Sequence, residues 1–93
     1  MTFQDLNFDN PTGLRFLNRQ AKAKFANGYG ASVVIGAYTY GGKEGLYELA
    51  VLGPDGHLDY STPVTSDVEG HLSPEDVTRL LQAIEALPMK EQP

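Results

Sequence analysis

The feature that most constrains this fold is an apolar stripe near the end of the chain. Its members recur every three or four residues, as they do on one side of an α-helix: Val77, Leu80, Leu81, Ile84 and Leu87. Before the stripe, Ser73 stands next to Pro74, with Asp76 three residues after the serine, which is typical of a helix start. Pro88 ends the run, so we predict a helix over 74–87. An isolated helix of this length is marginal in water, and its stripe must therefore pack on another element.

In the chain before this helix, apolar and polar residues alternate as they do in β-strands. Ala21, Ala23 and Phe25 fall on one side of a segment whose other side carries Lys22 and Lys24. Four stretches have this character and are short enough to be strands: 19–26, 31–38, 46–52 and 57–61. We therefore predict an α+β fold, an antiparallel β-meander of three to four strands with one C-terminal helix packed on one face.

Turn signals separate these strands. Asn27-Gly28 is the strongest short hairpin signal, because both residues tolerate the positive φ angles of a type I′ turn. The run 53–56 reads Gly-Pro-Asp-Gly and predicts a type I turn with proline at its second position. Consecutive strands are therefore expected to pair as hairpins.

The chain of 93 residues has room for one domain. Asn10-Pro11-Thr12-Gly13 interrupts any regular element near the start. We expect an irregular N-terminal segment over 1–18, a single α+β domain over 19–88 and a frayed tail over 89–93.

Charge and cysteine content exclude several classes of protein. The chain has no cysteine, which excludes a disulfide scaffold, a thiol nucleophile and a cysteine-based zinc site. Its net charge is −5, but five basic residues and no acid fall within 10–43, so the charge is uneven. Asp5 and Asp9 stand where a secretory signal would be basic, and no apolar run approaches the ~20 residues of a membrane span. We expect a cytoplasmic protein without membrane contact.

Three stretches carry a resemblance. They read NGYGASVV at 27–34, GLYELAVL at 45–52 and DYSTPVTSDVEGHL at 59–72. Together they resemble a family of small uncharacterised proteins encoded by tailed phages and prophages, over about residues 25–87. The family has no settled activity, so the resemblance implies a setting and assigns no site residue. It implies a phage protein in the cytoplasm of a bacterial host, with anti-CRISPR and anti-restriction proteins as examples of small accessory factors.

Residues that could support catalysis follow no known motif. His57 and His71 are the two histidines, and four acids stand near them in sequence, but the spacing matches neither a zinc motif nor a calcium loop: Asp55, Asp59, Asp67 and Glu69. No serine has a histidine at fixed local spacing. The glycine-rich run 41–45 lacks the pattern of a phosphate-binding loop. We predict no enzyme, no metal and no cofactor.

Tyrosines and acids are the better candidates for a binding surface. Tyrosine combines rigid contact area with a polar group and is enriched at interfaces. The acidic second half favours docking on a basic partner. The predicted partner-binding residues are Tyr29, Tyr40, Asp55, Asp59, Asp67, Glu69, Glu75 and Asp76. Lys22 and Lys24 share a sheet face that could meet phosphates, but the acidic half disfavours direct nucleic-acid binding.

The sequence thus favours a small non-catalytic phage accessory protein. It would bind and inhibit or modulate a bacterial host protein, such as a component of host defence. One alternative is a structural or assembly role as a homo-oligomer that pairs through exposed sheet edges. A further alternative is a small metal-dependent enzyme that uses His57, His71 and the nearby acids.

Overall fold

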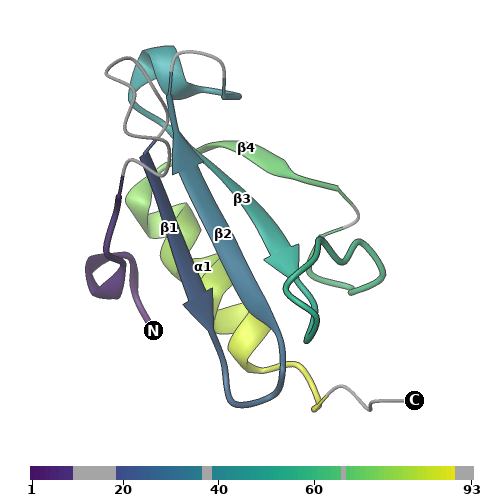
Figure 1. Ribbon diagram of the computed structural model, residues 1–93. Coiled ribbons are helices and arrows are strands. Elements are labelled where there is room, and N and C mark those ends of the chain that lie inside the picture. The colour runs from purple at the N-terminus through teal and green to yellow at the C-terminus, as the bar shows by residue number, and fades with distance from the viewer. Residues whose placement is uncertain (10–18, 37–38, 66, 90–93) are drawn as a thin grey trace.

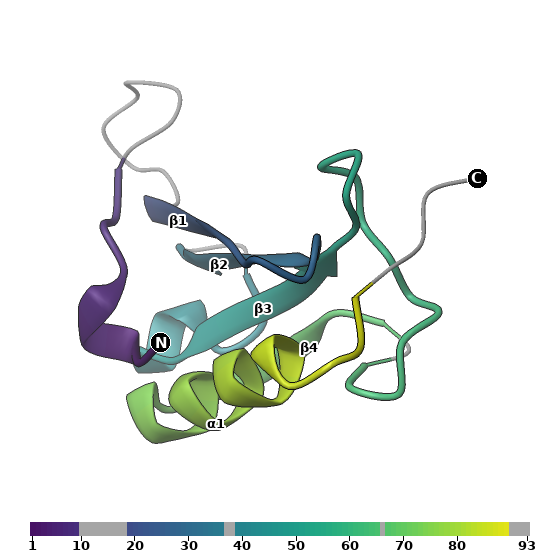
Figure 2. The same cartoon turned by 90° about the horizontal axis from the view of Figure 1, so that it is seen from below.

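A four-stranded antiparallel sheet and one helix form two layers (Figures 1 and 2). The computed structural model describes residues 1–9, 19–36, 39–65 and 67–89. The strands lie in the order in which they follow along the chain: β1 (Arg19–Lys24), β2 (Gly30–Ile35), β3 (Tyr47–Leu52) and β4 (Glu69–Leu72). The helix α1 (Pro74–Glu85) covers one face of the sheet, and two single 3₁₀ turns, η1 (Phe3–Asp5) and η2 (Gly42–Glu44), complete the elements. The predicted α+β meander with a terminal helix is confirmed.

The core lies between the sheet and α1. The helix contributes Val77, Leu81 and Ile84, each with 0% of its surface exposed, so its stripe packs as the periodicity predicts. The sheet contributes apolar side chains from the same face of its strands: Ala21, Ala23, Ala31, Val33, Leu49, Val51 and Leu72. Burial of each larger aliphatic side chain contributes about 1.5–3 kcal/mol, which is why the helix forms here although it is marginal alone.

The ends of α1 are set by two different side chains. At the start, the Ser73 hydroxyl accepts a hydrogen bond from the Asp76 N–H, and the Asp76 carboxylate accepts one from the Ser73 N–H, both at 3.1 Å. At the end, the Asn27 amide donates to the carbonyl oxygens of Ile84 and Leu87. The helix ends at Glu85, two residues before the predicted 87; Pro88 has no N–H to donate to the Ile84 carbonyl, and the Asn27 amide donates to it instead.

The first hairpin forms where Asn27-Gly28 predicts it, but the predicted type I′ turn is wrong. In the described part of the chain, His71 is the one residue other than glycine with a positive φ, so Asn27 does not adopt the required conformation. Gly28 alone does, at φ 92°, and its N–H donates to the Phe25 carbonyl. This is a three-residue loop, a type I turn followed by a left-handed glycine. The extra residue frees the Asn27 side chain to reach the helix.

The fourth strand lies elsewhere than predicted. The stretch 57–61 forms no strand; it adds one isolated bridge between Leu58 and Leu52 and a hydrogen bond from the Asp59 N–H to the Val51 carbonyl. Glu69–Leu72 pairs with β3 instead. The predicted turn at 53–56 forms, with a hydrogen bond from the Gly56 N–H to the Gly53 carbonyl, and Asp55 at its third position lacks the positive φ of a type II turn, as type I requires.

The start of the chain packs on the end of the two layers. The Phe3 ring lies 4.9 Å from the Tyr47 ring, edge to face, and Phe8 contacts both. The Asp9 backbone exchanges hydrogen bonds with Gln20, while Phe3 N–H donates to the Thr78 hydroxyl of α1. Residues 1–9 therefore bind both layers of the 19–88 unit. The remainder of the predicted segment 1–18, the last two positions of the predicted strand 31–38 and most of the tail 89–93 lie outside the described residues.

Candidate functional site

The face of the sheet opposite α1 is left uncovered by the helix. Lys22 and Lys24 stand on this face from the edge strand β1 and are exposed. Lys22 pairs across the strands with Ser32, and Ser32 pairs with Ala50, so these residues share the face. Lys22 and Lys24 point away from the helix because Ala21 and Ala23 between them supply the core side of the same strand.

The turn at 53–58 forms a wall on this face. Figure 2 shows the segment after β3 rising above the sheet on the side away from α1. The turn is held by hydrogen bonds from Gly53 N–H to the His57 carbonyl and from Gly56 N–H to the Gly53 carbonyl. It carries Leu58, whose side chain is 52% exposed, back beside Leu52.

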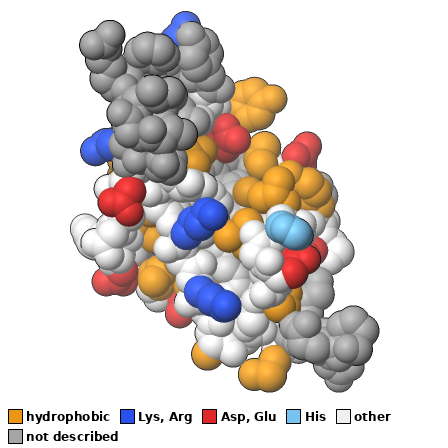
Figure 3. Space-filling model, viewed as in Figure 1, with side chains coloured by type: hydrophobic (Ala, Val, Ile, Leu, Met, Phe, Trp, Pro, Cys, Tyr) orange, Lys and Arg blue, Asp and Glu red, His pale blue; other side chains and the backbone are white. Residues whose placement is uncertain are grey.

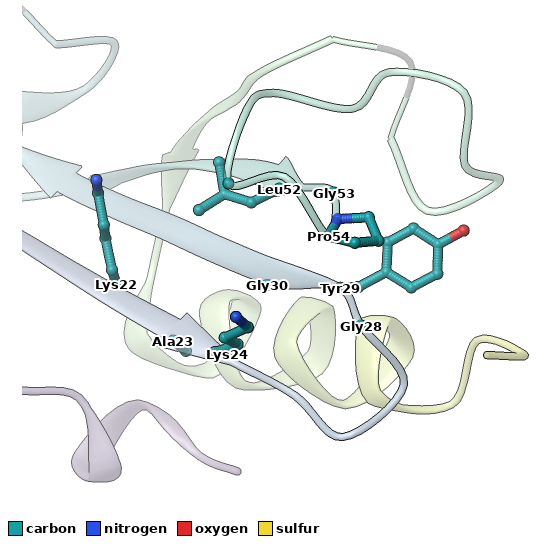
Figure 4. Close-up of a pocket in the computed structure, with 10 residues that line it drawn as sticks. Lys22, Ala23, Lys24, Gly28, Tyr29, Gly30, Leu52, Gly53 and Pro54 are labelled. Carbon is teal, nitrogen blue, oxygen red and sulfur yellow. The ribbon is translucent and has the colours of Figure 1, made fainter. Parts of the chain in front are cut away.

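Two adjoining cavities lie between β1 and this wall. One, of about 220 Å³, is bordered by Lys22 and Lys24 on one side and by Tyr29 and Pro54 on the other (Figure 4). The second, of about 530 Å³, extends along Gln20 and Ser32 toward His57 and Leu58. Both are open to solvent, and they share Lys22, Leu52 and Gly56. We call the two cavities together the basic groove.

The charge of the basic groove is opposite to that of the chain. Of the described residues that line it, two are lysines, one is a histidine and none is acidic, although the chain carries a net charge of −5. Figure 3 shows blue Lys or Arg side chains in the middle of this face and a histidine at its right side, with apolar side chains between them. The groove floor is fixed by a 2.8 Å hydrogen bond from the Gln20 amide to the Ser32 hydroxyl. The lysine side of the groove is therefore cationic and its wall partly apolar, while the Asp55 carboxylate lies 3.4 Å from His57 at the rim.

The two predicted tyrosines lie in different places. Tyr29 lines the basic groove beside Pro54 and is half-buried against the core. Tyr40 is 61% exposed near η2, where its N–H donates to the Glu48 carboxylate and its carbonyl accepts from the His71 N–H. Only Tyr29 among these two belongs to the groove.

The predicted acids do not form one patch in the structure. Asp55 and Asp59 lie in the connection after β3, where the Asp55 carboxylate accepts from the His57 N–H and Asp59 accepts from Ser61. The His57 N–H hydrogen bond holds the pKa of Asp55 below its ordinary value. Both carboxylates thus hold local turns.

Of the other predicted acids, Glu75 and Asp76 lie toward the opposite end of β3. Leu72 pairs with Tyr47 at the start of β3, and Glu75 and Asp76 follow in the first turn of α1, whereas Asp55 follows the end of β3. Asp76 accepts from Ser73 and from Arg79. Asp67 accepts from the Val68 N–H, and Glu69 is exposed at the start of β4 opposite Leu49.

The two histidines are also far apart. His57 stands in the turn after β3, and its ring lies 3.4 Å from the Asp55 carboxylate. His71 lies beside Glu48 near the start of β3, in a bulge of β4 where it adopts φ 55°. The six residues of β3 span about 20 Å. Within the described residues, no group of three or more His, Asp and Glu side chains is placed to hold a metal ion.

The groove is not apparent from the sequence, because the distribution of charge along the chain points to the acidic second half. In the sequence, Lys22 and Lys24 form the polar side of an alternating strand. That this side is the sheet face not covered by α1 becomes clear only in the structure. The sequence predicts the turn at 53–56 but follows it with a strand over 57–61, which would extend the sheet, whereas the structure has no strand there and the segment stands on the sheet face. None of the described helices is long and apolar enough to cross a bilayer. Comparison with protein-family models, curated proteins and solved structures gave no match to this chain.

Proposed function

We propose that this chain is a small non-catalytic binding protein that engages a partner protein through the basic groove. The observation that carries the proposal is the absence of acidic side chains among the described residues lining the groove, in a chain of net charge −5. Such a separation of charge gives an encounter surface a preferred partner and a faster association.

The polar groups near the groove support binding more than catalysis. Catalytic acid–base groups need to lie within hydrogen-bond reach of one another or of a substrate. The His57 ring contacts the Asp55 carboxylate at the outer rim of the groove. The Ser61 hydroxyl donates a hydrogen bond to the Asp59 carboxylate, and the Ser73 hydroxyl accepts one from the Asp76 N–H at the start of α1. The hydroxyl of Ser32, on the groove floor, accepts from Gln20.

In the setting that the resemblance to phage proteins implies, the partner is a bacterial host protein that the chain inhibits or modulates. The exposed apolar side chains beside the lysines support a protein partner, because interfaces combine apolar anchors with a charged rim. Leu58 supplies such an anchor at the groove wall.

Site-specific photo-crosslinking in bacterial cells tests this proposal. A photoreactive phenylalanine replaces Leu58 in the groove wall or, as the matched control, exposed Gln82 on α1. We expect a discrete crosslinked product with the first variant and none with the second. No product at position 58, or the same products at both positions, would refute the proposal.

A further inference from the structure

The spacing and charge of the groove define the chemistry of the segment that it receives. Lys22 and Lys24 are two residues apart on one strand and stand on the same face, which sets them about 7 Å apart along β1. An extended peptide repeats its side chains at the same interval on each of its faces. Carboxylates at alternate positions of such a peptide therefore match the two lysines.

We propose that the basic groove binds an extended acidic segment of a partner protein, with Glu or Asp at alternate positions and small apolar residues between them. This inference rests on the proposed function and names the chemistry of the partner. The carboxylates face Lys22 and Lys24, and an intervening side chain contacts Leu58 across the groove.

A second copy of this chain fits the groove poorly. Two β1 strands paired edge to edge would bring the lysines of both copies onto one face, and like charges across strands destabilise a sheet. The other edge strand, β4, does not place an acidic side chain on the face of the lysines either. Glu69 pairs with buried Leu49 and so stands on the helix side of the sheet, whereas the lysines stand on the other. An acidic segment of a different chain meets neither obstacle.

The groove also suits a peptide better than a nucleic acid. Single-stranded nucleic acids are bound by aromatic stacking platforms combined with several cations. Among the described lining residues the aromatic rings are Tyr29, which is half-buried against the core, and the His57 imidazole, which lies beside the Asp55 carboxylate. The apolar wall of Leu52, Pro54 and Leu58 favours aliphatic side chains.

Titration followed by backbone NMR tests the inference on the full chain. The probe is a ten-residue peptide in which Glu alternates with Val and Ala. A second peptide has the same composition with its glutamates grouped at one end, and a ten-nucleotide single-stranded DNA serves as the competing polyanion. We expect the alternating peptide to shift resonances of β1 and of residues 53–58, and to bind at least threefold more tightly than either of the other two.

Two variants of equal charge change locate the site. Lys22→Glu, in the groove, should weaken the alternating peptide at least fivefold, while Lys43→Glu, exposed on η2, should change it less than twofold. Thermal unfolding verifies that both variants are folded. The inference is overturned if the two peptides bind equally, if DNA binds more tightly on the same lysines, or if both variants behave alike. A positive crosslink at position 58 together with any of these results would retain the proposed function and reject the acidic segment.

Discussion

The side-chain amide nitrogen of Asn27 lies 2.8 Å from the carbonyl oxygen of Ile84, 57 residues further along the chain, so the first hairpin caps the end of α1. The same amide donates to the Leu87 carbonyl at 3.1 Å, and its oxygen accepts from the Tyr29 N–H. One side chain therefore fixes three things: the end of α1, the shape of the 25–29 turn and the distance between them. Tyr29, which borders the basic groove, is positioned by this contact.

We expect replacement of Asn27 to destabilise the fold through the helix end. Asn27→Ala removes the side-chain donor from the carbonyls of Ile84, which keeps the Leu87 N–H, and of Leu87, and the loss of these hydrogen bonds costs about 1–3 kcal/mol in total. Asn27→Asp should cost more, because it places a carboxylate against carbonyl oxygens at the negative end of the helix dipole. Urea unfolding measures both. Equal stability of the aspartate variant and the wild type would show that the amide does not act as a donor.

His71 holds a backbone conformation that few side chains tolerate. Its φ of 55° lies in the left-handed region, where asparagine is accepted and β-branched residues are strained. We expect His71→Asn to change the free energy of unfolding by less than about 0.5 kcal/mol, and His71→Val to lower it by about 1–3 kcal/mol. The measurement is chemical unfolding with and without added zinc. A loss of zinc-dependent stabilisation in the asparagine variant would instead favour the metal-dependent alternative.

The parts of the fold set by local patterns could be predicted, and those set by distant partners could not. The stripe of α1 and its Ser73 cap are local, as is the alternation of β1. In contrast, β4 has the sequence Glu-Gly-His-Leu, with no β-branched residue, and becomes a strand because β3 offers its edge. Gly70 is required there by a neighbour from another loop, since a Cβ at this position would stand 2.4 Å from the Tyr40 Cβ.

The candidate site was hidden for the same reason. The distribution of charge along the chain favours the acids as binding residues, yet the Asp55 and Asp76 carboxylates accept hydrogen bonds within their own turn and helix start. The groove arises where β1 meets the 53–58 turn, about thirty residues away in sequence. Alternation separates Lys22 and Lys24 from the core, but only tertiary structure shows that their face is bounded by a wall.

The start of α1 predicts a dependence of stability on pH. The hydrogen bond from the Ser73 N–H, and after it the Ser73 side chain, holds the pKa of Asp76 below its ordinary 3.8. A carboxylate with a lowered folded-state pKa stabilises the fold above the unfolded-state pKa, and this stabilisation is lost as the pH falls through the folded-state value. We expect the wild type to be more stable than Asp76→Asn at pH 7, with the difference shrinking below pH 4. Urea unfolding between pH 7 and 3 measures it.

A hydroxyl variant gives the control for this titration. Ser73→Ala should cost about 1 kcal/mol at pH 7 and retain most of that cost at pH 3, because the hydroxyl does not titrate in this range. A difference between wild type and Asp76→Asn that grows as the pH falls would contradict the assigned direction of the pKa.

The contact between Phe3 and Tyr47 predicts that residues 1–9 stabilise the sheet. The two rings meet edge to face with centroids 4.9 Å apart, in a geometry that favours aromatic pairs. In a double-mutant cycle with Phe3→Leu and Tyr47→Leu, we expect a coupling of about 0.5–1.5 kcal/mol in the free energy of unfolding. Phe3→Leu with Leu46→Ala supplies the control cycle, since the Phe3 ring makes its edge-to-face contact with Tyr47 and not with Leu46. Coupling in the control cycle as large as that with Tyr47 would mean that the start of the chain acts through general packing, whereas a larger value for Tyr47 assigns the stabilisation to the ring pair.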